Sequence, residues 1–200
     1  MRVGLLGGLD VVDDDGVEVV VAGAKPRALL AILALHVGRV VPADQLVDAL
    51  WGDDAPPGVR NGLQALVSKL RRALGSPGLV AIRGGGYALE VPTDAVDVHR
   101  YEQLIAAGRA AVEAGDLVGA VARFADADSL WRGDPLADFT YDEFATPAIG
   151  RLSELRLAVV EERVHVELAL GRHRGAIVER SRSRRGCAVT SASSSTVAPR

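Results

Sequence analysis

The hydrophobic positions near the N-terminus alternate over short runs, a spacing typical of β-strands. They predict strands at 2–6, 9–12 and 17–21, with a turn at 14–16, and together a small antiparallel sheet. Residues 25–37 are instead apolar almost all the way round, which predicts a helix buried on most of its sides. The chain is therefore expected to begin with a sheet and a core helix.

After a short extended link at 38–41, the apolar positions return at helical spacing. Residues 42–51 predict a second helix with three inward-facing side chains, Leu46, Leu50 and Trp51. The loop 53–58 contains two consecutive prolines, which lack the amide hydrogen and disfavour helix in the preceding residue. This loop is therefore expected not to be helical.

Residues 60–74 predict a third helix with one apolar stripe and one polar face. The stripe recurs at i, i+3, i+4, i+7 and i+11 and consists of Leu63, Leu66, Val67, Leu70 and Leu74. The middle of the outer face is formed by Asn61, Ala65, Ser68 and Arg72, with Gln64, Arg71 and Lys69 on its shoulders. Across residues 60–89 the chain has no acid and five cations, Arg60, Lys69, Arg71, Arg72 and Arg83.

The outer face of this third helix carries side chains that suit DNA. Asn and Gln can make paired hydrogen bonds to adenine edges, Arg and Lys to guanine, and cations also bind phosphates, as in a helix lying in a major groove. The candidate DNA contacts are Arg60, Asn61, Gln64, Ser68, Lys69, Arg71, Arg72 and Arg83. A basic outer face is also common on helices that are merely solvated, so the helix alone leaves both interpretations open.

A β-hairpin is predicted after a turn at 75–78, with Arg83 at its tip beside three glycines at 84–86. The glycines are not a phosphate-binding loop, because a strand follows them where a helix N-terminus and a Lys-Ser/Thr pair would be needed. They are expected to give the tip backbone freedom. The order strands, helix, link, helix, turn, helix, hairpin predicts a helix-turn-helix with a β-wing.

The second half of the chain is Ala-rich and follows a linker at 93–98. Helices are predicted at 98–114, 117–131 and 147–170. The first two, joined by A-G-D-L and carrying an A-x-x-x-F spacing from Ala120 to Phe124, indicate a tetratricopeptide-like hairpin, a unit that binds proteins. The expected inner positions are Tyr101, Leu104, Ile105, Gly108 and Val112 on the first helix, and Leu152, Leu155, Val159, Val164 and Leu168 on the last.

The composition is that of an ordinary globular chain, but the charged residues are unevenly distributed along the sequence. The 200 residues have a formal net charge of -3, yet the local field along 60–83 is basic and is what a phosphate backbone would encounter. Cys187 is the only cysteine, and residues 1–15 do not resemble a secretory signal, so a cytoplasmic protein without cofactor or metal is expected. Acids and histidines form no catalytic set in a recognisable local context, so an enzyme is not expected.

Two long segments resemble a known family. The sequence GRVVPADQLVDALWGDDAPPGVRNGLQALVSKLRRALG followed by IRGGGYALEV is similar to a winged-helix domain of the response-regulator type. The version of this domain that the sequence resembles is the one found in the antibiotic regulatory protein family of actinobacterial transcriptional activators. The run 97–173, with LWRGDPLADF and RLSELRLAVVEERVHVELALGRH, resembles the first part of the bacterial transcriptional activation domain that follows in the same family. Two adjacent matches in the right order strengthen each other.

The resemblance implies a role for each segment. Residues 60–74 would be the recognition helix, Arg83 would reach the minor groove, and the loop 52–59, with Asp53 and Asp54, would face RNA polymerase. Binding to direct repeats near promoters, possible self-association on DNA and no membrane are also implied. No receiver domain or ATPase module is recognised in these 200 residues, so phosphorylation control of the response-regulator kind is not expected.

The expected fold is an α+β winged helix-turn-helix domain at 1–94 followed by an all-α tetratricopeptide-like helical domain at 95–179. The Ser/Arg-rich tail at 180–200 is expected to be disordered because it has little apolar surface to bury. Its abrupt composition suggests a truncated activation domain, with the inner face of 147–170 partly uncovered. The expected function is a DNA-binding transcriptional activator of a biosynthetic gene cluster. The alternative is a protein-interaction adaptor with a vestigial winged helix.

Overall fold

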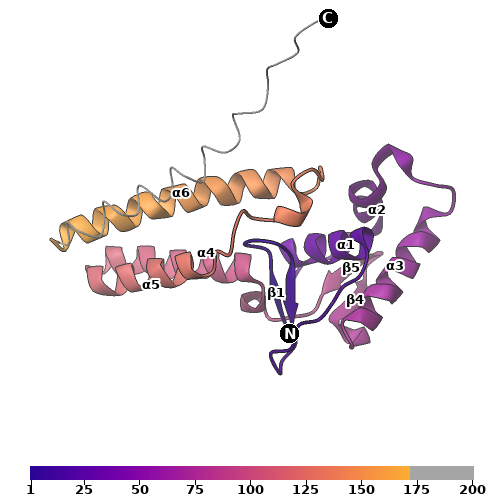
Figure 1. Ribbon diagram of the computed structural model, residues 1–200, viewed down its shortest axis with the longest axis horizontal. Helices are drawn as coiled ribbons and strands as arrows, with labels where there is room; N and C mark the ends of the chain where they lie inside the picture. Colours follow the sequence, from indigo (N-terminus) through magenta and orange to yellow (C-terminus); the bar gives the residue numbers. More distant parts are fainter. Residues whose placement is uncertain (172–200) are drawn as a thin grey trace, which may run out of the picture.

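The computed structural model describes residues 1–171, so the expected tail and the domain limit at 179 lie outside the described residues. A globular part made of three helices and a small sheet lies at one end, and a layer of long helices extends from it (Figure 1). In order, the first part contains β1 Arg2–Gly4, β2 Asp10–Val12, α1 Ala24–Leu35, β3 Val41–Pro42, α2 Ala43–Trp51, α3 Val59–Ala73, β4 Val80–Arg83 and β5 Gly86–Leu89. The helical part contains α4 Asp97–Glu113, α5 Leu117–Ser129 and α6 Thr146–Ala169.

The core of the first part is built around α1, which confirms the prediction of a helix buried on most sides. Every residue from Ala28 to Ala34 is buried, and α2 and α3 both pack on this helix. Leu46 and Leu50 of α2 face inward as expected, whereas Trp51 is half-buried beneath the Lys25 ammonium, 4.8 Å from the centre of its ring. His36 lies half-buried at the C-terminal end of α1, where Nδ1 is 2.8 Å from the Ile32 carbonyl oxygen.

The N-terminal sheet has two strands, so the prediction of a third strand at 17–21 is wrong. β1 and β2 are antiparallel, and the following segment contributes only an isolated bridge between Val12 and Glu18. Val17 and Val20 are 60% and 74% exposed, because no further element covers their side of the segment. The first strand also ends earlier than predicted, at Gly4, since the next two amides bind a carboxylate in place of a strand partner.

The wing is the hairpin β4–β5, and β3 completes a three-stranded antiparallel sheet in the order β3-β5-β4. Gly84 and Gly85 form the two-residue turn with φ of 53° and 81°, the left-handed conformations that such turns require. Gly86 has a different role, because a Cβ there would lie 2.2 Å from the Val41 carbonyl oxygen of β3. The three glycines thus serve the geometry of the hairpin, as the sequence indicated.

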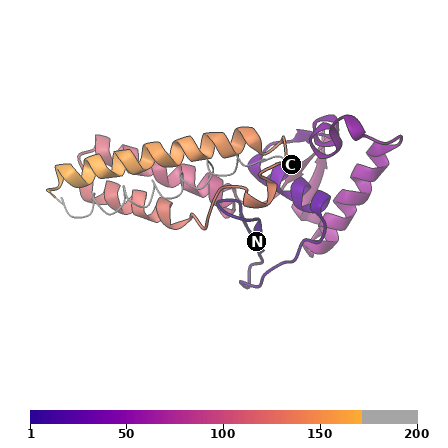
Figure 2. The same cartoon turned by 45° about the horizontal axis from the view of Figure 1, so that its top comes forward.

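The helical part consists of α4, α5 and α6 lying side by side (Figure 2). Gly108 of α4 faces Phe124 of α5 so closely that a Cβ at Gly108 would lie 2.6 Å from the ring. The Asp116 carboxylate caps α5 by accepting from the Gly119 amide at 2.8 Å. This pair of helices is the tetratricopeptide-like hairpin that the sequence predicted.

Several predictions about the faces of these helices are wrong in detail. Val112 of α4 is 37% exposed and Leu168 of α6 is 43% exposed, and each lies next to the C-terminal residue of its helix. The inner positions Leu152, Val159 and Val164 are buried, and Leu155 is half-buried. The expectation of an uncovered apolar strip along α6 therefore does not hold for these four residues. No helix among residues 1–171 is long and apolar enough to cross a membrane.

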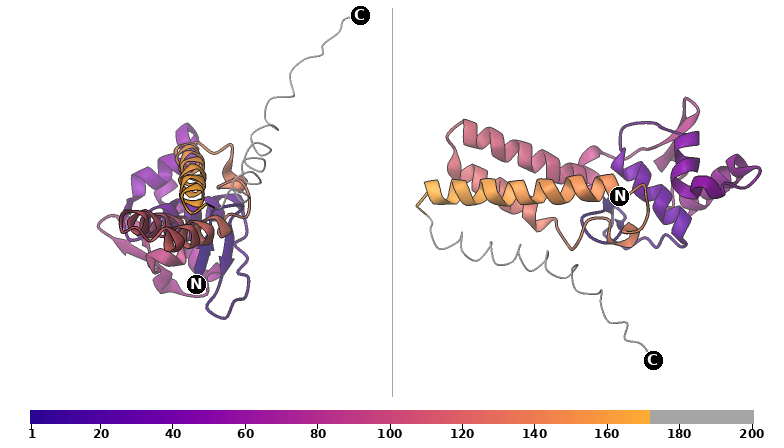
Figure 3. Two further views of the ribbon diagram at one scale, coloured as in Figure 1. Left: turned by 90° about the vertical axis from the view of Figure 1, so that its left-hand side faces the viewer. Right: turned by 90° about the horizontal axis from the view of Figure 1, so that it is seen from above.

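The two parts are packed together at the segment expected to be a linker. Residues 93–95 form a 3-10 turn, and Val96 and Val98 have no exposed surface. Residues 132–137 run beside residues 5–7, with backbone hydrogen bonds from Arg132 to Leu6, from Leu136 to Leu5 and from Ala137 to Gly7. Figure 1 shows β1 between the helical layer and the globular part, and in the view from above the N-terminal segment again lies where the two parts meet (Figure 3, right).

Candidate nucleic-acid interface

Helix α3 presents a polar face to solvent, as its sequence pattern predicted. Leu63, Val67, Leu70 and Leu74 are buried against the core, and Leu66 is half-buried. The helix begins after Gly58, which has a φ of 77°, and a second glycine with positive φ, Gly75, follows its end. The exposed residues among the predicted DNA contacts on this helix are Arg60, Asn61, Gln64, Ser68, Lys69 and Arg72.

Three of the exposed side chains already have partners within the protein. Arg60 pairs with Asp44 of α2 at 2.7 Å, but both side chains are 73% exposed, so the pair contributes little stability and can exchange partners. The Ser68 hydroxyl donates to the Gln64 carbonyl at 2.9 Å. Arg72 Nε donates to the Ser68 carbonyl at 3.4 Å, which leaves the rest of its guanidinium exposed on the outer face.

Arg71 differs from the other cations of α3 because its guanidinium is turned toward the wing. Its Nε and Nη2 donate to the Val80 carbonyl oxygen of β4, at 2.9 and 2.6 Å. The side chain is half-buried. The sequence placed Arg71 on a shoulder of the outer face, and the structure places its guanidinium between α3 and the hairpin.

Arg83 ends β4 immediately before the hairpin turn and is 63% exposed. Its Nη2 lies 3.0 Å from the Glu90 carboxylate, so the side chain is folded back along the hairpin. An ion pair this exposed is weak, so the Arg83 guanidinium remains able to turn outward. The outermost residues of the wing are Gly84 and Gly85.

The loop between α2 and α3 projects from the edge of the globular part (Figure 1). Every residue from Gly52 to Gly58 is exposed, including Asp53 and Asp54. The first three of these residues form a 3-10 turn, which corrects the expectation that 53–58 has no helical character at all. The prolines that follow stop this turn from continuing.

The residues that join the two halves were not predicted from the sequence. The Asp97 carboxylate accepts the Leu5 amide at 2.7 Å and the Leu6 amide at 2.9 Å, and Arg132 Nη2 lies 3.1 Å from it. Asp138 accepts the Leu9 amide at 2.7 Å and also pairs with Arg27 of α1. These partners are far apart in sequence, so no local pattern could have identified them.

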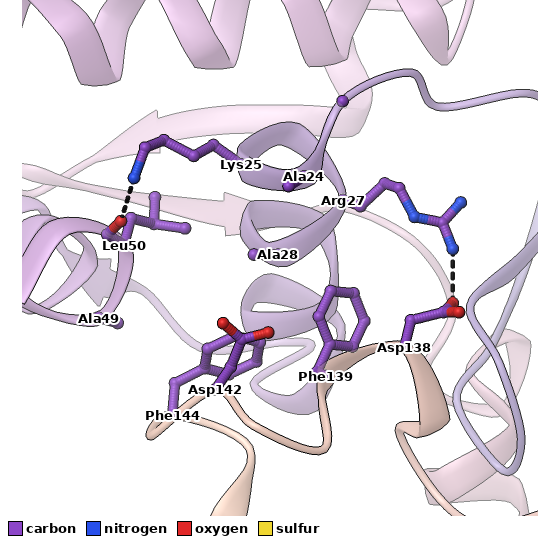
Figure 4. Close-up of a pocket in the computed structure, with 11 residues that line it drawn as sticks. Ala24, Lys25, Arg27, Ala28, Ala49, Leu50, Asp138, Phe139, Asp142 and Phe144 are labelled. Carbon is purple, nitrogen blue, oxygen red and sulfur yellow. Dashed lines mark hydrogen bonds and ion pairs between the residues drawn. The ribbon is translucent and has the colours of Figure 1, made fainter.

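A cleft of about 510 Å³ lies between α1, the end of α2 and the segment before α6 (Figure 4). The Lys25 ammonium donates to the Leu50 carbonyl, and the Arg27–Asp138 pair stands at the opposite side of the cleft. Phe139 and Phe144 line it, with ring centres 5.5 Å apart. The two cations that line the cleft, Lys25 and Arg27, are therefore already paired with groups of the protein.

His99 forms a second contact between the halves, from the first turns of α4 to the end of α1. Its Nε2 lies 3.2 Å from the Ala34 carbonyl oxygen and its Nδ1 lies 3.5 Å from the Glu102 carboxylate. The hydrogen bond to Glu102 raises the pKa of His99 above its usual value. His99, followed by Arg151, lowers the pKa of Glu102 to about 2.

Two protein-family models match the chain. The model described as "Transcriptional regulatory protein, C terminal" matches residues 17–89, which include α1, α2, α3 and the wing. The model described as "Bacterial transcriptional activator domain" matches residues 96–186, which include the three long helices. The fold is therefore a winged helix followed by an activator-type helical domain, as the sequence predicted.

Relatives of established role match most of the chain. Regulatory protein DnrI of Streptomyces peucetius is 39% identical over 191 residues, which cover 90% of this chain and 70% of DnrI. Regulatory protein AfsR of Streptomyces coelicolor is 36% identical over 166 residues, which are 82% of this chain but 16% of AfsR. A structure of Mycobacterium tuberculosis EmbR in complex with a low affinity phosphopeptide matches with a TM-score of 0.85 at 32% identity. It covers 90% of this chain, which spans 49% of that EmbR chain.

These relatives are regulatory proteins and not enzymes. Among residues 1–171, no group of three His, Cys, Asp or Glu side chains is arranged to hold a metal ion. Acids of the helical half such as Asp126 and Asp142 are exposed. The polar face of α3 and the adjoining wing therefore form the candidate functional site of the described molecule.

Proposed function

The chain belongs to the antibiotic regulatory protein family of actinobacterial transcriptional activators, and on that premise we propose that it binds duplex DNA sequence-specifically through α3 and the wing. Membership of this family confirms the resemblance seen in the sequence and makes the protein a transcriptional regulator. The proposal concerns how it acts: which surface meets DNA, which residues read the bases and which surface meets the transcription machinery.

The observation that carries the proposal is the exposed face of α3. Its opposite face is held in the core by buried leucines and a valine, so the helix cannot turn its polar side inward. That polar side has amide, hydroxyl and cationic groups, and no acid lies anywhere between residues 60 and 89. The chain as a whole has a net charge of -3, but this local surface is positive and therefore attracts a polyanion such as DNA.

The proposed contacts divide into base readers and backbone binders. Asn61, Gln64 and Ser68 lie closest to the bases, because their short polar groups suit direct contact with base edges. Lys69 and Arg72 contribute groove and phosphate contacts, and Arg60 binds phosphate after exchanging its exposed partner Asp44. Arg83 enters the minor groove beside the helix after leaving Glu90.

The activating surface is proposed to lie on the other exposed features. The loop containing Asp53 and Asp54 is free to meet RNA polymerase because each of its residues from Gly52 to Gly58 is exposed. We propose the division expected from the sequence, with a DNA-binding domain at 1–94 and an activation domain at 95–179; the two family models, which match residues 17–89 and 96–186, support it. Protomers bound head to tail on direct repeats near a promoter would present these loops on one face of the duplex. A regulator of this kind acts on the chromosome, in the cytoplasm.

The test begins with in vitro selection of duplexes bound by the purified chain, followed by gel shifts on the selected site at several salt concentrations. We expect a specific complex whose log affinity falls linearly with log salt, with a slope of about 0.9 per neutralised phosphate. Arg72→Ala should weaken binding by about 1–3 kcal/mol at one position if it reads a base, or weaken all sequences alike if it binds phosphate.

Arg123→Ala is the matched control, because it removes an exposed arginine from α5, an element far from α3 (Figure 1). It should leave the affinity unchanged. Failure of the wild-type chain to retain any duplex at low salt would refute the proposal. That outcome would favour a protein-interaction adaptor, in which the tetratricopeptide-like helices bind a partner and the winged helix is vestigial.

A further inference from the structure

The contact between Arg71 and the wing identifies a residue with a different task from its neighbours on α3. We propose that Arg71 is a positioning residue, which fixes the hairpin β4–β5 relative to the recognition helix and does not itself contact DNA. The inference rests on the proposed DNA binding. It explains how α3 and the hairpin, the two elements proposed to contact DNA, are held in a fixed relative orientation. It separates Arg71 from Lys69 and Arg72, with which the sequence grouped it.

The register of the hairpin explains why the Val80 carbonyl needs a partner. The Glu90 amide donates to the Leu79 carbonyl at 2.8 Å, and Val80 lies opposite Leu89. Because hydrogen-bonded and non-hydrogen-bonded pairs alternate along an antiparallel ladder, Val80 belongs to a non-hydrogen-bonded pair. Its carbonyl therefore points away from β5. Since β4 is an edge strand of the sheet, no further strand within residues 1–171 pairs with that oxygen.

Arg71 supplies the missing donors from the last turns of α3. Two guanidinium nitrogens meet the single oxygen, at 2.9 and 2.6 Å, which fixes both the distance and the orientation of the side chain. The Val80 side chain itself is fully buried, so the start of β4 cannot rotate to present this oxygen to water. A carbonyl in this position is costly to leave unpaired.

The chain between the two residues cannot fix the wing by itself. The connection includes Gly75, which has a φ of 70°, and Gly78, whose surroundings are open. Glycine allows a wide range of backbone conformations, so this connection by itself constrains the β4 side of the hairpin less than the pairing of β5 with β3 constrains the other side. The Arg71–Val80 contact crosses that connection. Arg83 lies three residues beyond Val80 on the same strand, so the position of Arg83 depends directly on this anchor.

The charge of Arg71 is not what this role requires. A phosphate contact depends mainly on positive charge and accepts lysine, whereas two parallel donors to one oxygen require the guanidinium group. The half-buried state of Arg71 contrasts with exposed Lys69 and Arg72, which are free to meet a phosphate. Arginine at 71 and lysine at 71 should therefore behave differently.

The experiment compares Arg71→Met and Arg71→Lys with Arg72→Met, a matched substitution at the adjacent exposed position. In the free full-length protein, hydrogen exchange of the β4 and β5 amides should accelerate about tenfold in both Arg71 variants, as expected for loss of a charge-assisted hydrogen bond. It should stay unchanged in Arg72→Met. Circular dichroism checks that each variant is folded, and the lysine variant serves if the methionine variant is not.

The binding measurements use the duplex recovered by selection on a randomised library. Arg71→Met and Arg71→Lys should each weaken binding by about tenfold with the salt slope unchanged. Combining either with Arg83→Ala should add little to the loss, because the wing contact is already displaced. Arg72→Met should instead combine additively with Arg83→Ala.

Three outcomes would overturn the proposal. Unchanged exchange in the hairpin would show that Arg71 does not hold the wing. A salt slope reduced by about 0.9 in Arg71→Met, with wild-type affinity in Arg71→Lys, would show a phosphate contact. If the wild-type chain bound no duplex, the proposed function would fail and with it any role of Arg71 in DNA binding, whereas hydrogen exchange in the free protein would still show whether Arg71 anchors the hairpin.

Discussion

Replacing Asp97 by alanine should uncouple the two halves of the protein. The Asp97 carboxylate accepts two backbone amides, from Leu5 and Leu6, and both of those residues have no exposed surface. Alanine would leave two buried donors without their acceptor. The Arg132 guanidinium would also lose a partner at 3.1 Å, but it is 40% exposed and keeps Asp10 at 3.5 Å, so this loss is small.

The expected magnitude follows from the two amide bonds. A hydrogen bond to a charged group contributes about 1.5–3 kcal/mol, and removing the acceptor adds the cost of an unsatisfied donor. Since the Asp97 side chain is only 14% exposed, solvent cannot replace it easily. We expect a loss of about 3–5 kcal/mol in the free energy of unfolding. At a urea m-value of about 2 kcal/mol/M this lowers the midpoint by about 2 M.

The two tryptophans allow each half to be followed separately. Trp51 ends α2 in the winged helix, and Trp131 lies beside Tyr101 in the helical half, with ring centres 5.3 Å apart. In single-tryptophan variants, fluorescence should show coincident urea transitions for the wild-type sequence. In Asp97→Ala the two transitions should separate, because the contacts that couple the halves have been weakened.

Asp94→Ala is the control, since Asp94 is an exposed acid three residues away. It should unfold at the wild-type midpoint with both probes. If Asp97→Ala also kept the wild-type midpoint and coincident transitions, the conclusion that this carboxylate joins the halves would be wrong.

Two further predictions concern the wing and the His99 contact. Gly86→Ala should displace β5 from β3, because its Cβ would lie 2.2 Å from the rigid Val41 carbonyl oxygen; a thermal melt should show destabilisation, and DNA affinity should fall even on the selected site. The contribution of the His99–Glu102 pair to stability should be greatest between about pH 4.5 and 6.5. Because the folded-state pKa of His99 is raised, its contribution is fully present below about 6.5 and is lost as pH rises through the raised value. The pKa of Glu102 is lowered from 4.5 to about 2, so its contribution is lost as pH falls through that interval. In the wild-type chain the urea midpoint should therefore fall as pH rises through the raised pKa of His99. In His99→Gln this fall should disappear, and an unchanged pH dependence would contradict the assignment.

The sequence by itself determined the elements and the outward face of the recognition helix. The stripe from Leu63 to Leu74 set which side of α3 is buried, and the opposite side had to carry its polar residues. The three glycines before Tyr87 likewise predicted a tight hairpin. Periodicity is a local property of the chain, so one sequence is enough to reveal it. The family resemblance came from the same local motifs in their order.

Only the tertiary structure decided which residues meet across the chain. Asp97 binds the amides of Leu5 and Leu6, more than 90 residues away, within a segment that composition marked as a linker. Arg71 looked like its neighbour Arg72, yet the register of β4 directs a carbonyl toward Arg71 and leaves Arg72 exposed. The segment at 17–21 alternated like a strand but had no further element to cover it. Partner choice depends on how separate elements pack, and local residue patterns do not encode that information.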